Sequence, residues 1–600
     1  MCGIAGYVGR RAATPILLES LKRLEYRGYD SCGIAIVNDD DIFVRRVAGR
    51  IEQLEAIMNR QTAAASHFPT GTVGIGHTRW ATHGRVDVQN AHPLASCDGS
   101  ILVVHNGIIE NADTLRSDLM AQGHTFTSET DSEVVAHYVE EQVKTGESID
   151  RAVLSLPKVL TGSFGLLIAH KGSNELYVTR RGSPLVIGVG DHEFYPASDI
   201  PSFLPMTSRV LYLRENEVFA VNLDGVHLLE PGTDRRTMRV DLSRSQAVNL
   251  HASSSSKGNF DHFMVKEIVE QTETLSHLIR QEPEHLQAVV GTLRDADQIY
   301  LVGAGTSYHA CLYAEYILAQ SAGRSTRAVV SSEFEHRMRP ITSKSVVVAL
   351  SQSGETADTV AAVDLAVEAG AQVIAVTNTE ESSLAHKANF VVPLESGLEI
   401  AVAATKSYTA QLGWAVLMNY GLQGKLEFGA RELWRARDNL FNLTSDSARE
   451  HVRFQAQSLV DAKSVFLLGR GIHYVTALEA ALKIKEVAGI RAEAFPGGEM
   501  KHGPLALIEE GTPVLLFYDS AGQHQAETAA SELVSRGARA YTIGPKPLRV
   551  SVEHIRIDDT GISTPISQIV PMQILSYELA RLRNLDPDHP RNLAKAVTVS

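Results

Sequence analysis

Short apolar or β-branched runs, separated by glycine and polar residues, fill the first 240 residues of the chain. These runs predict strands at 33–37, 42–47, 73–77, 101–104, 164–169 and 175–178. Two stretches, 132–143 and 149–156, have the apolar spacing of amphipathic helices. Because helices interrupt the strands without strict alternation, the pattern predicts an α+β domain with packed antiparallel sheet over 2–240.

The pattern changes after a polar stretch that contains four consecutive serines, 253–256. Low apolar content predicts an interdomain linker at 241–260. Beyond it, an apolar strand, a glycine-rich turn and a long helix recur, which is typical of parallel α/β units. Ile299-Tyr-Leu-Val-Gly303-Ala-Gly305 is similar to Val465-Phe-Leu-Leu-Gly469-Arg-Gly471, an offset of 166 residues that two further strands approximately repeat. The sequence therefore predicts two copies of one α/β domain, at 285–430 and 455–590, and a tail at 591–600.

Composition and charge narrow the possible partners. The chain has 56 Lys and Arg against 70 Asp and Glu, a net charge of −14 that opposes binding to nucleic acid or an anionic membrane. Two uncharged runs, 407–424 and 560–577, contain polar residues and are interpreted as buried helices rather than membrane spans. The four cysteines form no Cys-x-x-Cys pair, and no signal segment opens the chain, so we expect a cytoplasmic protein without disulfides.

Cys2 directly follows the initiator methionine and precedes a glycine. Removal of Met1 would give the thiol carrier a free α-amine, whose pKa of about 7.7–8.0 suits a general base beside a thiol with a pKa of about 8.5. The simpler interpretation is a small apolar residue at the start of a strand.

Three polar motifs lie near predicted strand ends or a helix start. Arg79-Trp-Ala-Thr-His83-Gly84 and His105-Asn106-Gly107 each follow a strand, and Ser128-Glu-Thr-Asp131 precedes a helix. Acyl transfer from an amino-acid amide needs a cation, a carboxylate and oxyanion donors, which Arg79, Asp131 and Asn106 with the Gly107 N–H provide. The alternatives are a surface ion pair for Arg79, a helix N-cap for Asp131 and a type I′ hairpin turn for Asn106-Gly107.

Together with Met-Cys2-Gly-Ile-Ala-Gly-Tyr and Tyr26-Arg-Gly-Tyr-Asp-Ser31, these motifs resemble the glutamine amidotransferases with an N-terminal nucleophile. The resemblance implies an N-terminal-nucleophile hydrolase (αββα) glutaminase domain in which Cys2 forms a glutamyl thioester and Asn106 with Gly107 forms the oxyanion hole. It also implies that Trp80 borders an ammonia channel. The glutamine-binding residues implied are Arg79, Trp80, Thr82, His83 and Asp131.

Two loops of the first α/β copy carry polar donors. Gly303-Ala-Gly305-Thr306-Ser307 follows a strand and opens a helix, a location that favours an anion, although Gly303 also suits tight strand–helix packing. Ser351-Gln352-Ser353-Gly354-Glu355-Thr356 offers clustered hydroxyl and amide donors that suit a sugar phosphate, with helix capping by Ser353 as the alternative. Both loops resemble the sugar isomerase fold. The sugar-phosphate-binding residues proposed on this basis are Thr306, Ser307, Ser351, Gln352, Ser353, Thr356, Val402, Ala403 and Ala594.

Candidates for sugar chemistry lie in the second copy and the tail. Aldose–ketose interconversion with amination needs ring opening, a base between adjacent carbons and an amine. His502, Glu486 and Lys595 are residues of these types, and Lys483 lies three residues before Glu486. A surface ion pair between Lys483 and Glu486 and a solvated Lys595 are the alternatives.

Nearly the entire chain resembles the isomerising glutamine:fructose-6-phosphate aminotransferases. The resemblance implies that His502 assists ring opening, Lys595 forms an imine with fructose 6-phosphate, and Glu486 moves a proton from C1 to C2. Ammonia from Cys2 then displaces the lysine, giving glucosamine 6-phosphate and glutamate. It also implies a homodimer through the sugar isomerase half.

Other functions stay open at this stage. Ala404 stands where that family usually has a serine, so a paralogue that aminates a different keto-sugar phosphate is one alternative. A non-catalytic sugar-phosphate sensor is another, although it would not need Cys2, Glu486, His502 or Lys595. We expect no cofactor. His83, His92 and His105 lie in separate loops, so no metal site is predicted.

Overall fold

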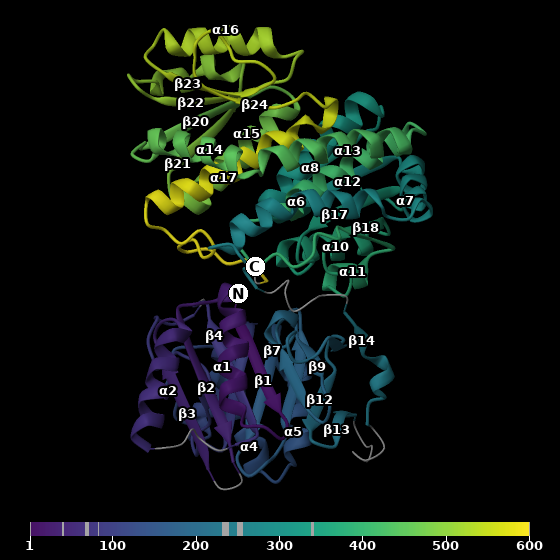
Figure 1. Cartoon of the computed structure of the whole chain (residues 1–600). Coiled ribbons are helices and arrows are strands. Elements are labelled where there is room, and N and C mark those ends of the chain that lie inside the picture. Colours follow the sequence, from purple (N-terminus) through teal and green to yellow (C-terminus); the bar gives the residue numbers. More distant parts are fainter. Residues whose placement is uncertain are drawn as a thin grey trace. The chain divides into compact units, whose positions relative to one another are not determined.

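The computed structural model describes residues 2–38, 41–65, 71–81, 83–230, 239–248, 256–337 and 341–598, without the side chains of 61–65. Met1, Thr82 and most of the serine run lie outside these residues. The chain divides into two compact units, Met1–Ser256 with Ala594–Ser600, and Lys257–Leu593. Figure 1 colours the first unit mainly purple to blue.

Two antiparallel sheets form the centre of the first unit. In the described residues, the larger sheet has the strand order β14-β11-β9-β10-β1-β4-β2-β3, and the smaller has the order β13-β12-β8-β7-β6-β5. The strands are β1 (Gly3–Val8), β2 (Ser31–Val37), β3 (Ile42–Val47), β4 (Val73–Arg79), β5 (Leu94–Ala95), β6 (Ile101–Ile109), β7 (Gly162–His170), β8 (Leu176–Arg181), β9 (Val186–Val189), β10 (Phe194–Ala197), β11 (Arg209–Tyr212), β12 (Val218–Asn222), β13 (Gly225–Leu228) and β14 (Gln246–Ala247).

Apolar side chains on alternate strand positions bury both faces of each sheet. Ile4 and Val8 pack with Val104 and Leu167 between the sheets. Helices α1 (Ala13–Leu24) and α2 (Ile51–Ala65) cover the outer face of the larger sheet. Helices α3 (Ala112–Ala121), α4 (Glu133–Lys144) and α5 (Ile149–Val159) cover the smaller one. The order helix, sheet, sheet, helix confirms the predicted αββα fold.

The second unit contains two parallel five-stranded sheets with equivalent topology. Their strand orders are β16-β15-β17-β18-β19 and β21-β20-β22-β23-β24. In each sheet, the strand that comes first in the chain lies between the second and the third. This repetition confirms the predicted pair of parallel α/β subdomains. The strands are β15 (Gln298–Gly303), β16 (Thr326–Val330), β17 (Ser345–Ser351), β18 (Gln372–Thr377), β19 (Phe390–Pro393), β20 (Ser464–Gly469), β21 (Arg491–Pro496), β22 (Pro513–Phe517), β23 (Arg539–Gly544) and β24 (Ser551–Arg556).

Helices of both copies pack into one shared core. Leu301 of the first copy and Leu467 of the second belong to the same buried cluster, together with Trp414. The main helices are α6 (Phe263–Ile279), α7 (Pro283–Asp295), α8 (Thr306–Ser321), α10 (Ala357–Glu368), α12 (Lys406–Leu422), α13 (Leu426–Leu443), α14 (Asp446–Leu459), α15 (Ile472–Lys483), α16 (Gln523–Val534) and α17 (Thr564–Leu582). Nearly every residue of α12 and α17 is buried, which confirms that the two uncharged runs are buried helices. A search of the described helices found none with the length and apolarity to cross a membrane.

Candidate active site

Cys2 lies immediately before β1, beside the end of β4. Register pairs Gly3 with Thr78, so the thiol reaches the first residues after β4. The Trp80 N–H donates to Cys2 Sγ at 3.2 Å, and Sγ lies 3.4 Å from the Trp80 carbonyl oxygen. Burial raises the pKa of the Cys2 thiol. A thiol in this state needs a base to become a nucleophile, which is the role predicted for an adjacent α-amine.

Asn106 and Gly107 lie inside strand β6 rather than after a strand. They pair with Gly165 and Phe164 of β7, so the prediction of a loop and the alternative of a hairpin turn are both wrong. Gly107 has φ +124°, and a Cβ at this position would lie 2.1 Å from the Ser163 carbonyl oxygen. Only glycine fits this backbone, so Gly107 allows strand β6 to continue through the motif.

The Asn106 side chain is held in one orientation. Its Nδ2 donates to the Cys2 carbonyl oxygen at 2.8 Å, and its Oδ1 lies 3.0 Å from His77 Nε2. Nε2 is also 3.0 Å from the His105 carbonyl oxygen, and because both partners accept, Nε2 carries the proton. Burial lowers the pKa of His77 to about 3, so the imidazole is neutral at pH 7. His77, which the sequence analysis did not select, therefore aims the Asn106 amide at Cys2.

Arg79 ends β4 and is only 4% exposed. Its guanidinium donates to the carbonyl oxygen of Arg85 at 3.2 Å and to that of His83. Burial lowers the pKa of Arg79, while Cys2 and Asp131 are among the groups that oppose the shift. The surface ion-pair interpretation is therefore wrong, and the cation lies within electrostatic range of both residues.

Asp131 is buried before α4 and does not cap that helix. The helix N-cap is Ser132, without a side-chain cap bond, so the N-cap interpretation of Asp131 is wrong. Asp131 Oδ2 accepts from the Ile109 N–H at 2.8 Å, and the Ser132 hydroxyl donates to Oδ1 at 3.3 Å. These bonds connect the carboxylate to the end of β6, the strand that carries Asn106.

The remaining predicted glutamine-binding residues are less closely defined. His83 is exposed, and Thr82 lies outside the described residues. Trp80 packs edge-on against Tyr29, with ring centroids 5.7 Å apart. Its place beside an ammonia channel stays a prediction.

The glycine-rich loop of the first α/β copy has the predicted strand–helix geometry. A Cβ on Gly303 would lie 2.8 Å from the Ser307 carbonyl carbon, so Gly303 does permit tight packing. Gly305, with φ +53°, is the N-cap of α8, where the helix dipole favours an anion, although the Ser307 N–H donates to the Ala304 carbonyl oxygen at 3.0 Å. The Ser307 hydroxyl accepts from Gln411 Nε2 at 2.9 Å.

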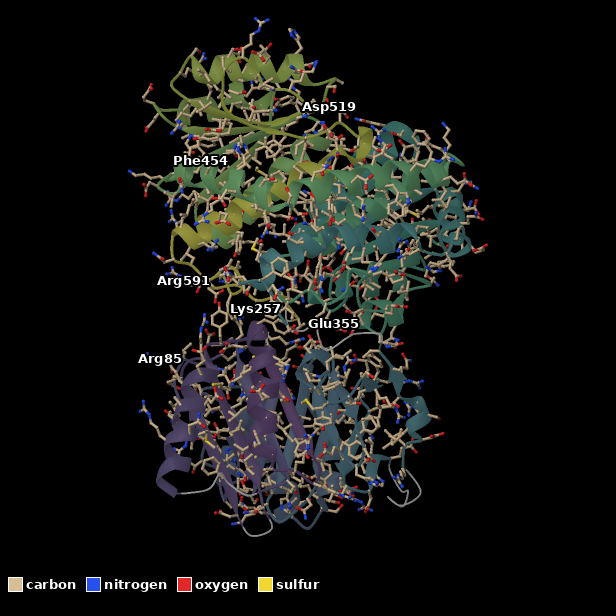
Figure 2. All side chains as sticks on the ribbon, in the orientation of Figure 1. Arg85, Lys257, Glu355, Phe454, Asp519 and Arg591 are labelled. Atoms are coloured by element: carbon tan, nitrogen blue, oxygen red, sulfur yellow. The ribbon has the colours of Figure 1, made fainter. Side chains whose placement is uncertain are left out.

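The serine-rich loop lies between β17 and α10. Ser351 Oγ accepts from the Gly354 N–H at 3.0 Å and lies 3.3 Å from Thr356 Oγ1. Thr356, not Ser353, is the N-cap of α10, so the capping interpretation of Ser353 is wrong. Glu355, labelled in Figure 2, accepts from the Ser383 N–H and hydroxyl at 2.8 Å each, which fixes the loop.

Lys483 forms the centre of a buried charge cluster between the two copies of the second unit. Its Nζ lies 2.6 Å from Glu486 Oε2 and 3.4 Å from Glu479 Oε1, and it donates to Thr306 Oγ1 at 3.1 Å. Lys483 and Glu479 are fully buried, so the surface ion-pair interpretation of Lys483 is wrong. Burial opposes the charge of Lys483, but Glu486 and Glu479 outweigh it and raise its pKa. Glu486 itself lies in a π-helical segment, Ile484–Ala488, a distortion common at functional sites.

Glu479 and His309 join this cluster although no sequence motif predicted them. Glu479 Oε1 accepts from the Thr306 hydroxyl at 3.0 Å, and Oε2 lies 2.7 Å from His309 Nδ1. The sequence signal for Glu479 is its position four residues before Lys483 on the same helix. An exposed ion pair has the same spacing, so this signal does not distinguish a buried cluster.

None of the contacts described for the Lys483 cluster involves the remaining predicted sugar-site residues. His502 is exposed in the 3₁₀ segment Glu499–His502. Val402 and Ala403 are buried before α12, where the Val402 N–H donates to the Asp588 carbonyl oxygen at 3.1 Å. Ala594 and Lys595 belong to the segment grouped with the first unit, so their roles at the sugar site stay predictions.

Comparison with known proteins identifies the family of the chain. A glutamine amidotransferase domain model matches residues 77–205, and a SIS domain model matches 292–418 and 458–557. Glutamine-fructose-6-phosphate aminotransferases (isomerizing) from Thermococcus kodakarensis and Pyrococcus horikoshii are 39% and 40% identical, each over 100% of both chains. The C-terminal domain of glucosamine-fructose-6-phosphate aminotransferase from Francisella tularensis is 27% identical with a TM-score of 0.52, and the match covers 56% of this chain and 100% of that one. The chain therefore belongs to the isomerizing glutamine-fructose-6-phosphate aminotransferase family.

Proposed function

We propose that the chain hydrolyses L-glutamine at Cys2 and channels the ammonia to D-fructose 6-phosphate, producing D-glucosamine 6-phosphate and L-glutamate. The glutaminase domain is assigned to 2–240 and the linker to 241–260. The sugar isomerase copies are assigned to 285–430 and 455–590, with a catalytic tail at 591–600. We further propose that the enzyme is cytoplasmic and dimerises through its sugar isomerase half.

The first step follows from the geometry around Cys2. The thiolate attacks the glutamine amide carbon, and the tetrahedral oxyanion accepts from Asn106 Nδ2 and the Gly107 N–H. Asn106 Nδ2 already reaches the Cys2 carbonyl at 2.8 Å, so the donor lies at the nucleophile before substrate arrives. Arg79 binds the α-carboxylate of glutamine and Asp131 its ammonium group. Collapse of the oxyanion releases ammonia, and water then hydrolyses the thioester.

The second step uses the sugar isomerase half. The N-terminus of α8 and the hydroxyls of the serine-rich loop bind the phosphate. His502 assists ring opening, and Lys595 forms an imine at C2 of the open-chain ketose. Ammonia displaces Lys595 from this imine, and Glu486 then takes a proton from C1 and returns it at C2, which gives the 2-amino aldose. The ion pair between Lys483 Nζ and Glu486 Oε2, 2.6 Å apart, orients this carboxylate.

The observation that carries the proposal is the convergence of Cys2, Asn106 and His77 in a unit that is followed, in the same chain, by a polar sugar-phosphate loop and a buried acid–base cluster. A sensor would need neither arrangement. The test incubates the purified chain with glutamine and fructose 6-phosphate and quantifies glutamate and glucosamine 6-phosphate, with Lys595→Ala as the control. Equal amounts of both products, with the amino sugar lost in the control, support the proposal. Formation of glutamate without amino sugar would contradict fructose 6-phosphate as the acceptor. It would favour a different keto-sugar phosphate, the alternative that Ala404 suggests.

A further inference from the structure

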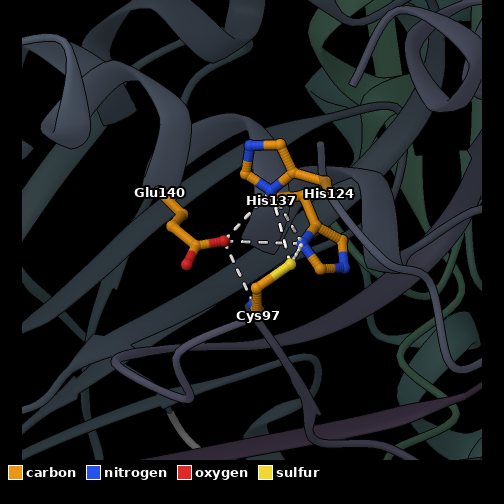
Figure 3. Close-up of side chains that lie close together, drawn as sticks. All are labelled: Cys97, His124, His137 and Glu140. Atoms are coloured by element: carbon orange, nitrogen blue, oxygen red, sulfur yellow. Dashed lines mark hydrogen bonds and ion pairs between the residues drawn. The ribbon is translucent and has the colours of Figure 1, made fainter. Parts of the chain in front are cut away.

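Four potential metal ligands meet in the first unit, and none of them is a residue assigned to glutamine. Cys97 lies between β5 and β6, His124 follows α3, and His137 and Glu140 lie one turn apart on α4. Figure 3 shows the thiol, both imidazoles and the carboxylate turned toward one point. One ligand atom from each residue lies within 4.8 Å of all the others.

The separations between these atoms match a tetrahedral ion. Cys97 Sγ lies 3.6 Å from His124 Nδ1 and 3.4 Å from His137 Nδ1. The two Nδ1 atoms are 3.3 Å apart. Glu140 Oε2 is 3.1 Å from His124 Nδ1 and 3.6 Å from His137 Nδ1. Zinc bonds of about 2.3 Å to sulfur and about 2.0 to 2.1 Å to nitrogen or oxygen give ligand–ligand separations of about 3.3 to 3.6 Å in a tetrahedron.

The other nitrogen of each imidazole faces a carboxylate. His124 Nε2 lies 3.0 Å from Glu141 Oε2, and His137 Nε2 lies 3.4 Å from Glu133 Oε1. With Nε2 donating to these carboxylates, each imidazole presents Nδ1 to the other ligands, as ion binding requires. Carboxylates that orient histidine ligands in this way are the usual outer shell of a zinc site.

The anionic ligands are fixed by N–H donors. The Cys97 N–H donates to Glu140 Oε2 at 3.0 Å, and Lys144 Nζ lies 3.0 Å from Oε1. Cys97 Sγ accepts from the Thr125 N–H at 3.3 Å. The side chains of His124, His137 and Glu140 are at most 2% exposed, whereas Cys97 is exposed and leaves a route for an ion.

We propose that Cys97, His124, His137 and Glu140 bind one divalent ion of the zinc class. One thiolate and one carboxylate balance its charge, and four protein ligands leave no position for substrate, which defines a structural site. The ion connects the β5–β6 turn, the segment after α3 and helix α4. The prediction that the chain has no metal site rested on His83, His92 and His105, which do not belong to this cluster.

The site also supports the segment that leads to Asp131. Glu133, which faces His137, accepts from the Thr127 N–H at 2.8 Å and the Ser128 N–H at 2.7 Å. Ion binding therefore fixes His137, and through Glu133 it stabilises the turn before the proposed glutamine ligand.

The test measures metal in the untagged full-length chain by mass spectrometry, after chelation, reloading with Zn²⁺ and gel filtration. We expect about one zinc per chain for the wild type and for Cys2→Ala, a matched thiol control in the same unit. We expect loss of that zinc in Cys97→Ser and His124→Asn. Reloading with Co²⁺ is expected to give thiolate-to-metal charge-transfer absorption in the wild type that is absent in Cys97→Ser.

A second variant separates metal binding from misfolding. Glu141→Gln keeps all four ligands, and its zinc affinity is expected to fall about 10- to 100-fold with an unchanged circular dichroism spectrum. A wild-type chain that retains no more zinc than Cys97→Ser would overturn the proposal and leave a hydrogen-bonded Cys–His–His–Glu cluster. Equal zinc in wild type, Cys97→Ser and His124→Asn would overturn it as well. None of these outcomes depends on glutamine turnover, so the proposed function is tested separately.

Discussion

The two copies of the sugar isomerase fold share a backbone but differ in the chemistry of their loops. Gly305 and Gly471 have φ values of +53° and +56° and each caps the helix after its first strand. After the third strand in chain order, the first copy has Ser351-Gln-Ser-Gly, whereas the second has Tyr518-Asp519-Ser520. Figure 2 labels Glu355 in the first loop and Asp519 in the second.

At the second loop, Asp519 and Tyr518 contact side chains from helices α15 and α17 of the same copy. Asp519 Oδ2 lies 3.4 Å from His473 Nε2, and His473 Nδ1 lies 2.8 Å from Gln568 Oε1. Gln568 Nε2 donates to the Tyr518 carbonyl oxygen at 3.0 Å. A carboxylate at this position disfavours a phosphate. The comparison teaches that both copies keep the same glycine-capped strand–helix backbone, while their side chains differ in the way that the proposed function needs: phosphate binding in the first copy and acid–base residues in the second.

The largest expected effect is on amino-sugar formation, through the acid–base residues proposed in the second copy. In Glu486→Gln, formation of the amino sugar is expected to fall about 10²- to 10⁴-fold, because the proton carrier between C1 and C2 is removed. Steady-state assays of glucosamine 6-phosphate check this, with the exposed Glu493→Gln as a control on the same copy. Unchanged amino-sugar formation would remove Glu486 from the mechanism.

The buried cluster between the copies is the second most sensitive point. In Lys483→Met, the free energy of unfolding is expected to fall by about 3 to 5 kcal/mol, because Glu479 loses its buried cation. Chemical denaturation measures the loss. The double variant Glu479→Gln with Lys483→Met is expected to recover part of it, and a double variant less stable than Lys483→Met would contradict this account.

The loop at Asp519 in the second copy gives a smaller, pH-dependent effect. The hydrogen bond with His473 lowers the pKa of Asp519 to about 2, below the unfolded value of about 3.9. The resulting stabilisation is present above pH about 4 and is lost as pH falls toward 2. We expect about 1 to 2 kcal/mol, discounted because the Asp519 side chain is 29% exposed.

Urea unfolding of wild type and Asp519→Asn between pH 3 and 7 tests that window. The stability difference is expected to shrink toward the acid end, while Asp191→Asn, at a fully exposed carboxylate, is expected to show little difference at any pH. A difference that stays constant with pH would show that Asp519 does not stabilise the fold through its charge.

The smallest effect compares the two loops directly. In Ser353→Ala, the KM for fructose 6-phosphate is expected to rise about 5-fold through loss of one hydrogen bond to phosphate. Asp519→Asn is expected to leave this KM unchanged. Equal rises in both variants would assign phosphate binding to both copies and contradict the division between them.

The sequence predicted the layered fold well because its signals are local. Alternating apolar residues and repeated strand–turn–helix units predict strands and sheets without knowledge of which strands pair. The position of Asn106 and Gly107 inside β6 was missed, because the pairing with β7 overrides the turn preference of Asn-Gly. The glycine-rich and serine-rich loops were identified because strand ends mark sites in parallel sheets.

Other site features depend on distant contacts that no local pattern reveals. In the sequence, Glu479 and Lys483 have the spacing of an exposed ion pair on a helix. Their contacts with Thr306, which is distant in sequence, are visible only in the structure. His77 was missed because its neutral state and its bond to Asn106 both result from burial between strands. Similarly, the Cys97 cluster draws on four positions spread from 97 to 140, a spacing unlike any short zinc motif.

Ammonia transfer from Cys2 to the sugar is the central claim, and isotope labelling tests it most directly. The chain is incubated with [amide-¹⁵N]glutamine, fructose 6-phosphate and excess unlabelled ammonium, and the amino sugar is analysed by mass spectrometry. Channelling predicts that nearly all of the glucosamine 6-phosphate carries ¹⁵N despite the external ammonium. An amino sugar diluted to the isotopic ratio of the solution would contradict channelled transfer.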